Sequence, residues 1–317
     1  MCNKLVSVVM CCYNEEIQWV KKSIESLINQ EYKNLEIIIV NDNPDNLDII
    51  SLLTRYLKID RRIKVLFNNK NIGLVKSLNK ALLECNGEYI ARMDADDVSK
   101  LNRIKKQVEF MEKNNEVGLV MSYANFIDEF DNKIGEQRNT PIKFEQIKKI
   151  LMYKNVAVHP TWLFRKSILS KLKRYNECMY VEDYEFLCRA IINGIILETL
   201  PEFLLDYRVR KTSICNSNRL FQQINFQTIN KSYIAALKGK PYCILENFDS
   251  NNLKNLKYLK FTQDNIYRGK VLINEKKYIK GSILIFFNVI GNRYKINQLI
   301  NEIKYRMNLK FLNNNFT

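Results

Sequence analysis

Short runs of β-branched and aliphatic residues alternate with amphipathic segments along the first 121 residues, and this alternation constrains the fold most. The apolar runs predict strands over residues 5–12, 35–40, 63–67, 88–93 and 117–121. Apolar residues with a helical period predict helices over residues 18–29, 47–57, 74–83 and 101–111. Strands and helices in this order indicate βαβ units, so we expect an α/β fold whose mostly parallel sheet is flanked by helices.

Polar residues follow three of these strands, at the point where each strand ends. Residues 13–15 follow the first strand, Asn41 and Asp42 follow the second, and residues 94–97 follow the fourth. Ligands of such sheets bind beyond the carboxyl ends of the strands, so these clusters predict one composite site. The chain has neither a G-x-G-x-x-G nor a G-x-x-x-x-G-K-[ST] loop, so bound phosphates would need a divalent cation beside the acidic groups.

Three carboxylates lie within four residues at Asp94, Asp96 and Asp97. Carboxylates this close raise one another's pKa, and a hard cation such as Mg²⁺ or Mn²⁺ removes that repulsion by taking their oxygens as ligands. The alternative is a solvated acidic turn before the helix that begins near Leu101. The position after a buried strand, beside two other polar strand ends, favours the metal site.

The net charge of +16 is concentrated in the last third of the 317 residues. Residues 212–317 hold 17 lysines and arginines against five aspartates and glutamates. Three interpretations are open: binding to nucleic acid, attraction to an anionic membrane, or a solvated basic face. Because the basic residues alternate with isoleucine, leucine, phenylalanine and tyrosine, amphipathic helices on a membrane surface are favoured, and no nucleic acid is expected.

No segment approaches the ~20 consecutive apolar residues that a membrane span needs. The longest candidate, residues 283–290, is short and contains Asn288. The N-terminal residues lack the cleavage site of a signal peptide, so we expect a cytoplasmic protein. Its eight cysteines form no C-x-x-C pair and it has a single histidine, which predicts reduced thiols and no zinc site.

Six segments together resemble bacterial glycosyltransferases of family 2. They are, in order, SVVMCCYNE (7–15), IVNDN (39–43), NIGLVKSLNKA (71–81), GEYIARMDADD (87–97), HPTWLFR (159–165) and VEDYE (181–185). The resemblance implies a GT-A fold over residues 1–215, with a nucleotide-sugar-binding half (1–121) and an acceptor-side half (122–215). Residues 216–317 would form a basic, mainly helical extension.

The resemblance also implies an inverting enzyme with a nucleotide-sugar donor, usually a UDP-sugar, and Mn²⁺ or Mg²⁺ as cofactor. The donor-site positions that match the family are Cys11, Tyr13, Glu15, Asp42, Asn71, Gly73, Lys76, Asp94, Ala95 and Asp96. Tyr13 matches the ring that stacks on the base, and Asp42 the carboxylate that accepts from the uracil imide. Asp94 and Asp96 match the metal-binding D-x-D motif, in which Asp96 ligates the metal.

Structural roles remain open for three of these residues. Tyr13 is alternatively a packing residue, and Asp42, which precedes Asn43 and Pro44, is alternatively a turn cap. For Lys76 a solvated position on the helix is as well supported as a contact with the ribose or diphosphate.

A second pair of acids, Glu182 and Asp183, opens a segment of helical period. In the family pattern Asp183 is the general base that takes the proton of the acceptor hydroxyl. Glu182 would contact acceptor or donor sugar. Acids in a first helical turn are also favoured by the helix dipole, which is the structural alternative. His159 and Trp162 are assigned to the acceptor side, with structural packing as the alternative for both.

One position departs from the family pattern. The segment LLDYRVRKTS (204–213) resembles a stretch in which the family has a histidine near the metal or diphosphate, and Arg210 stands at that position. An arginine does not ligate a metal, but it pairs with phosphate. Arg210 is therefore assigned to the diphosphate.

The sequence thus predicts a hexosyltransferase of polysaccharide biosynthesis, such as that of lipopolysaccharide O-antigen or capsule. Its acceptor would be a saccharide or an undecaprenyl-diphosphate-linked glycan, and the protein would lie peripherally at the inner face of the cytoplasmic membrane. A catalytically silent GT-A binding module anchored by its basic tail is the alternative. A nucleotidyltransferase is disfavoured, because residues 13–16 after the first strand are acidic rather than basic.

Overall fold

The computed structural model describes residues 3–137, 141–178, 180–210, 219–243 and 277–290, with isolated further positions between 265 and 305. The chain divides into two compact units. The first comprises Met1–Lys148, Val156–Glu177 and Glu182–Lys211, and the second comprises Lys149–Asn155, Cys178–Val181 and Thr212–Thr317. The division into functional parts at residue 215 stays a prediction.

The described part of the first unit contains a nine-stranded sheet of order β3-β2-β1-β4-β8-β6-β9-β5, with β7 paired to β6. Its strands are β1 (Val6–Cys12), β2 (Leu35–Asn41), β3 (Ile63–Phe67), β4 (Tyr89–Asp94), β5 (Val98–Ser99), β6 (Val117–Ile127), β7 (Lys133–Glu136), β8 (Leu163–Arg165) and β9 (Ile196–Arg208). Strands β1 to β4 pair in parallel, as do β6 and β9, whereas β5, β7 and β8 pair antiparallel. The predicted mostly parallel α/β sheet is confirmed.

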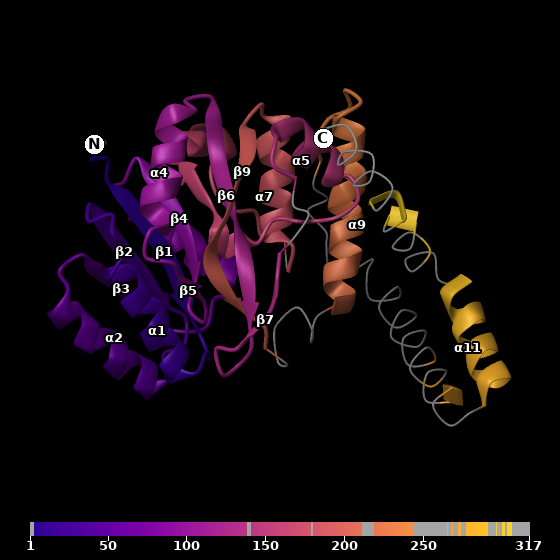
Figure 1. The fold of residues 1–317 in the computed structure, drawn as a ribbon, viewed down its shortest axis with the longest axis horizontal. Coiled ribbons are helices and arrows are strands. Elements are labelled where there is room, and N and C mark those ends of the chain that lie inside the picture. Colours follow the sequence, from indigo (N-terminus) through magenta and orange to yellow (C-terminus); the bar gives the residue numbers. More distant parts are fainter. Residues whose placement is uncertain are drawn as a thin grey trace. The chain divides into compact units, whose positions relative to one another are not determined.

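Helices connect the parallel strands, as the periodicity predicts (Figure 1). The helices of the first unit are α1 (Ile17–Ile28), α2 (Leu47–Ile59), α3 (Leu74–Leu83), α4 (Arg103–Lys113), α6 (Leu169–Leu172) and α7 (Glu182–Ile192), and α5 (Phe144–Ile150) begins in this unit. Short 3₁₀ turns, η1 (His159–Thr161) and η2 (Lys166–Ile168), flank β8. The acceptor-side strands from β7 onward were not predicted, because short or irregular strands lack a clear period.

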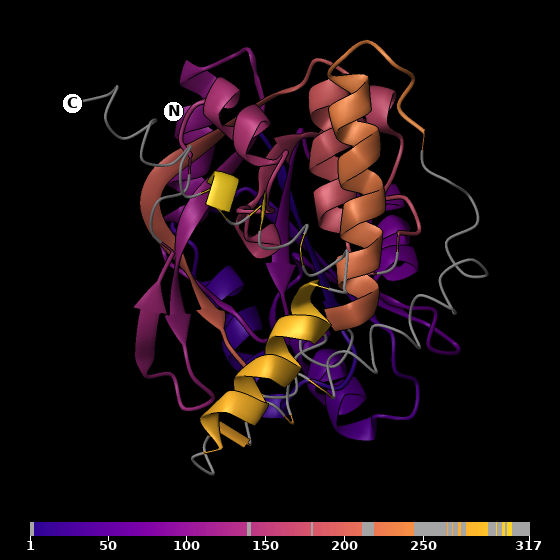
Figure 2. The same ribbon diagram turned by 90° about the vertical axis from the view of Figure 1, so that its right-hand side faces the viewer.

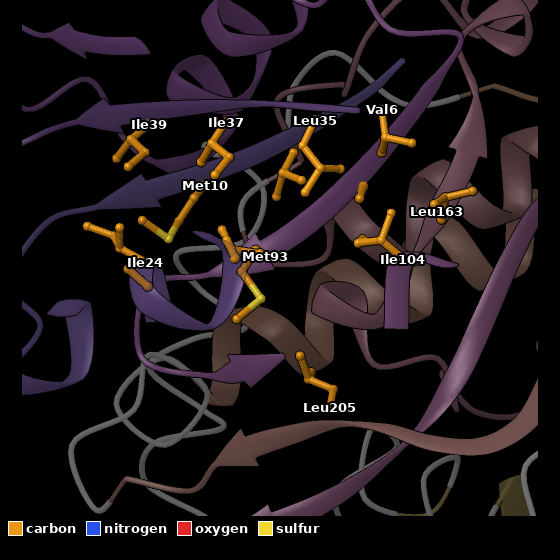
Figure 3. Close-up of a cluster of buried hydrophobic side chains, with 14 of the residues drawn as sticks. Val6, Met10, Ile24, Leu35, Ile37, Ile39, Met93, Ile104, Leu163 and Leu205 are labelled. Carbon is orange, nitrogen blue, oxygen red and sulfur yellow. The ribbon is translucent and has the colours of Figure 1, made fainter. Parts of the chain in front are cut away.

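One hydrophobic core lies on the face of the sheet that carries alternate residues of β1 (Figure 3). Side chains alternate across a strand, so Val6 and Met10 point to the same face. They pack with Ile24 of α1 and Ile104 of α4, all fully buried. On the other face α3 lies against β1 and β2. The parallel strands are therefore fixed from both sides, which makes their carboxyl ends a rigid platform.

The strand register brings three of the polar clusters to one edge of this sheet. Cys11 of β1 lies between Val40 of β2 and Asp94 of β4. Cys12 lies opposite Asn41 in the same ladder. The three strands therefore end at the same level, and the segments that leave them start side by side.

The second unit contains α9 (Arg219–Ala236) and α11 (Tyr278–Ile290), coloured orange and yellow in Figure 2. Asn230 of α9 donates through Nδ2 to the carbonyls of Leu151 and Met152, which belong to the same unit. In the described part of the chain, no helix is both long enough and apolar enough to span a bilayer.

Candidate active site

The segment after β1 is tied to the end of β2. The Tyr13 backbone N–H donates to Glu15 Oε2 at 2.7 Å, and Asn43 Nδ2 donates to Asn14 Oδ1 at 2.6 Å. The Tyr13 side chain is 41% exposed, so its ring is accessible to a stacking partner. Burial raises the pKa of the Cys11 thiol to about 12, so this thiol is neutral.

Asp42, at the end of β2, organises the loop before α3. Its Oδ1 accepts from Asn68 Nδ2 at 2.8 Å and from the Ile72 N–H at 2.9 Å, and its Oδ2 accepts from the Gly73 N–H at 2.8 Å. Gly73 has a φ of +86°, a conformation that strains other residues, which explains the glycine at this position. Asp42 therefore acts as the anchor of this loop, a role close to its turn-capping alternative.

Two donor-site candidates on that loop lie at the surface. The exposed Asn71 accepts from the Gly73 N–H through Oδ1 at 2.9 Å. The exposed Lys76 ion-pairs with Glu177 Oε2 at 3.5 Å. Such an exposed pair is weak, so it does not hold Lys76 away from a charged ligand.

Asp94, Asp96 and Asp97 form a compact acidic cluster after β4. Carboxylate oxygens of the three side chains lie within 4.8 Å of one another, and Asp96 and Asp97 are buried together with Ala95. Burial, and then the charge of Asp94, raise the pKa of Asp96 to about 7. Burial and the charges of Asp96 and Asp94 raise the pKa of Asp97 well above its usual value.

One oxygen of this cluster lacks a partner. Asp97 Oδ1 accepts from the Arg208 N–H at 2.8 Å, whereas the buried Oδ2 has no hydrogen-bond partner among the described residues. A buried carboxylate oxygen without a hydrogen-bond donor is energetically costly. A hard divalent cation takes such oxygens as ligands and removes this cost. The donor set therefore fits Mg²⁺ or Mn²⁺.

Three arginines surround the acidic cluster. The buried Arg92 of β4 ion-pairs with Asp94, and Arg210 Nε lies 2.7 Å from Asp96 Oδ2. Arg208 donates through Nε to the Asp96 carbonyl at 2.8 Å, and its guanidinium lies 5.1 Å from the centre of the Trp19 ring. The cluster is thus partly neutralised by cations of the chain itself.

Arg92 and Arg208 are functional candidates that the sequence reasoning missed. Arg92 stands inside an otherwise apolar strand, and a charged residue at such a position was the available signal. Its ion pair brings Nη1 close to Asp94, but Nε and Nη1 make no well-directed hydrogen bond within the described residues. Arg92 is therefore a buried cation held mainly by charge. Its charge opposes the rise that burial causes in the pKa of Glu182 and adds to the fall that burial causes in the pKa of His159.

The second acidic pair lies at the start of α7. Glu182 is buried, and burial followed by the charge of Asp183 raises its pKa to about 8. The charge of Asp94 contributes in the same direction, so the two acidic groups are close enough to interact. Asp183 is partly exposed, and its Oδ1 accepts from the Tyr184 N–H at 2.6 Å. A partly exposed carboxylate beside a protonated one can receive a proton from a ligand.

His159 and Trp162 lie in an aromatic cluster next to this pair. The His159 Nε2 atom and the Tyr175 hydroxyl are 2.9 Å apart, and burial lowers the pKa of His159 well below its usual value. Trp162 is fully buried, with its ring centre 4.5 Å from that of His159. Both side chains therefore pack in the core, which matches the structural alternative for each.

The candidate residues thus fall into three sets. Those that interact at the strand ends are Cys11, Glu15, Asp94, Asp96, Glu182, Asp183 and Arg210. Those on the rim or supporting loop are Tyr13, Asp42, Asn71, Gly73 and Lys76. His159 and Trp162 lie in the packed aromatic cluster.

A mostly parallel sheet with an acidic cluster at its carboxyl edge is typical of GT-A glycosyltransferases. Residues 7–173 match the family model described as glycosyl transferase family 2. The chain belongs to this family and is a glycosyltransferase.

Curated relatives extend the match over most of the chain. An uncharacterized glycosyltransferase of Haemophilus influenzae is 31% identical over 98% of this chain and 94% of its own length. The O-antigen biosynthesis glycosyltransferase WbnJ of Escherichia coli is 34% identical over 66% of this chain and 81% of its own length.

A solved structure shares the fold. It is that of S. aureus TarS, residues 1–349, in complex with UDP-GlcNAc. Its TM-score is 0.59 at 14% identity, and the match covers 98% of this chain and 92% of that one.

Proposed function

We propose that this glycosyltransferase moves a sugar from a UDP-sugar to a saccharide acceptor with inversion at the anomeric carbon. The observation that carries the proposal is the presence of two different carboxylate groups at one sheet edge. The first is the cluster of Asp94, Asp96 and Asp97, and the second is the pair of Glu182 and Asp183. The first group can bind a cation that contacts a diphosphate, and the second can accept the proton of an attacking hydroxyl.

Donor recognition would use the ends of β1 and β2. The exposed ring of Tyr13 offers a stacking surface for a base. Each carboxylate oxygen of Asp42 can accept two hydrogen bonds, and Oδ2 accepts one from Gly73. Its remaining lone pair suits an imide N–H, which uracil has and cytosine lacks. The UDP-GlcNAc in complex with TarS supports a UDP-sugar donor here.

Asp94 and Asp96 would hold Mg²⁺ or Mn²⁺, with the unpartnered Asp97 Oδ2 beside them as a further oxygen. When bound, the cation supplies charge neutralisation for the leaving diphosphate, so no acid is needed for the leaving group. The surrounding arginines keep the three acids together before a ligand arrives.

Asp183 would act as the general base. An acceptor hydroxyl that attacks the anomeric carbon must lose its proton to a group on the face opposite the diphosphate. Because Glu182 keeps its own proton up to a pKa of about 8, it is suited to donate a hydrogen bond to a sugar oxygen. This separates the roles of two adjacent acids, since a pair this close does not ionise fully at neutral pH.

The acceptor would be a cell-surface glycan precursor, as the O-antigen function of WbnJ suggests by analogy. Helix α11 supports a location at a membrane. Its exposed Tyr278, Ile279, Ile283 and Phe286 lie on one face, with Lys277 nearby. Such a face suits an anionic lipid surface. Flotation with anionic vesicles tests this, because Ile279→Glu with Ile283→Glu should reduce binding of the full chain at low salt.

The donor site is tested by the thermal stability of the full chain with UDP, GDP, dTDP or CMP, each with and without Mn²⁺. A ligand that binds the folded state raises the unfolding temperature. We expect stabilisation by UDP that requires the metal. Preference for another nucleotide would contradict the Asp42 assignment, and no stabilisation by any of the four would favour a silent binding module.

A further inference from the structure

The carboxylate assigned to the metal is already engaged by a cation of the chain. Arg210 Nε lies 2.7 Å from Asp96 Oδ2, and the two side chains are only 20% and 10% exposed. This contact is short and shielded from water, so it is stronger than an ordinary surface ion pair. An incoming divalent cation therefore meets a guanidinium, which does not lose its charge by deprotonation.

Arg210 and Arg208 contact different groups of the acidic cluster. Arg208 makes well-formed bonds to the carbonyls of Asp96 and Asp128 and to the Asp131 carboxylate, so it is a fixed part of the framework. Arg210 follows β9 and places its guanidinium 5.9 Å from the centre of the Trp19 ring. The carboxylate that it pairs with is the same Asp96 that the metal would need.

The charges decide what happens when a metal approaches. Two like charges about 4 Å apart at a partly buried site repel strongly in the absence of screening. A guanidinium and a divalent cation that both contact Asp96 would lie within that range. Their repulsion therefore weakens the binding of each to this carboxylate. A free diphosphate group nearby would offer the guanidinium two or more oxygens in its preferred fork geometry.

We propose that Arg210 is an exchangeable counter-cation: it neutralises Asp96 in the ligand-free protein, yields this carboxylate to the metal, and moves to the donor diphosphate. The metal half of this proposal, in which Arg210 leaves Asp96 as the metal binds, depends only on the acidic cluster. The diphosphate half rests on the proposed function. No covalent bond is made or broken. Exchange of the guanidinium for a divalent cation adds one positive charge at the cluster, and the donor diphosphate would offset it.

The competing role for Arg210 is that of a positioning residue that orients Asp96 while the metal binds the other oxygen. Partners of metal ligands that act in this way typically strengthen metal binding by 10–100-fold. The two roles therefore predict opposite effects of removing Arg210. This difference in sign makes the proposal testable without an activity assay.

The test is Mg²⁺ binding to the full chain by calorimetry, without nucleotide, for the wild type and Arg210→Gln. We expect about tenfold tighter Mg²⁺ binding in the variant, because a competing charge has been removed. Arg210→Lys keeps the charge and should remain close to wild type. Arg55→Gln is the matched control, since Arg55 is an exposed residue of α2. Equal or weaker binding by Arg210→Gln would overturn the proposal.

A second readout follows the guanidinium itself in the unmutated protein. The chain has two tryptophans, and only Trp19 lies beside Arg210, whereas Trp162 is fully buried. Mg²⁺ should change the fluorescence of the wild type, and Trp19→Phe should lose this change while it still binds Mg²⁺. A wild type that binds Mg²⁺ calorimetrically without any change in emission would contradict the movement.

The diphosphate half has its own measurement. At saturating Mg²⁺, Arg210→Gln should bind UDP about tenfold more weakly than wild type, because a charge-assisted contact is lost. Unchanged UDP affinity would overturn this half alone. If the wild type itself fails to bind UDP, the proposed function fails, and the Mg²⁺ comparison still decides whether Arg210 competes for Asp96.

Discussion

The two acidic groups of the site contain the same kinds of side chain but have different neighbours. Asp94 and Asp96 each contact an arginine, Arg92 and Arg210 respectively. Glu182 makes no ion pair among the described residues, and its buried position dominates its raised pKa. Burial raises the pKa of Asp96 to about 7 and that of Glu182 to about 8, and the charge of Arg210 opposes the rise at Asp96. A cation beside a buried carboxylate therefore makes its charged form less costly.

This difference explains how one sheet edge can serve two chemical tasks. The first group can exchange a guanidinium for a divalent cation and so stays paired with positive charge. The second group keeps one proton on Glu182 and leaves Asp183, which is more exposed, to take up another. Because Arg92 influences both groups, it is the physical link between them.

The largest expected effect comes from the first group. Asp96→Ala should remove metal-dependent UDP binding and lower sugar transfer by about 10³-fold or more, because the carboxylate that holds the cation is lost. Calorimetry with UDP and Mg²⁺ and a transfer assay measure the two effects. Asp48→Ala, at an exposed position of α2, is the control. Undiminished metal-dependent affinity in Asp96→Ala would move the metal site elsewhere.

The next largest effect is expected at Asp183, where a substitution should change catalysis without changing UDP binding. Asp183→Asn should lower kcat by about 10²–10⁴-fold, the contribution typical of a general base, while UDP affinity stays near wild type. Transfer kinetics and UDP calorimetry on one preparation measure both. Loss of both activity and UDP binding would show that Asp183 supports the donor site and is not the base.

The repeating strands and helices made the parallel half of the sheet predictable. Buried runs such as residues 35–40 alternate with helical periods, so β1 to β4 and α1 to α4 lie close to their predicted bounds. β8 has only three residues and inserts antiparallel between β4 and β6. Nothing local in Leu163–Arg165 specifies that place, because it depends on contacts between distant segments.

The site was predictable where the residue type and its position in the sequence indicate a particular chemistry. Acids after a buried strand indicated the cluster at Asp94 and Asp96, and the register of β1 with β4 brings it beside Cys11. The contact between Arg210 and Asp96 joins residues 114 positions apart, so the sequence indicated phosphate for Arg210 and missed its carboxylate partner. The burial of Trp162 likewise depends on packing against Phe186 of α7.

The smallest expected effect concerns stability. The native state holds the Glu182 proton up to a pKa of about 8, whereas the unfolded chain releases it near the ordinary value of 4.5. Between these values the native state binds more protons than the unfolded state, so this group lowers stability as pH rises from about 5 to 8. Glu182→Gln stays neutral at every pH and does not contribute such a slope.

The difference in unfolding free energy between Glu182→Gln and the wild type should therefore shift in favour of the variant by on the order of 3 kcal/mol between pH 5 and pH 8. At higher pH this difference should stay constant. Thermal unfolding of both proteins across this range measures the difference, with the exposed Glu109→Gln as the matched control. Parallel curves for wild type and Glu182→Gln would mean that Glu182 is ionised in the native state. The two acidic groups would then be alike, and the separation of cation and proton between them would be lost.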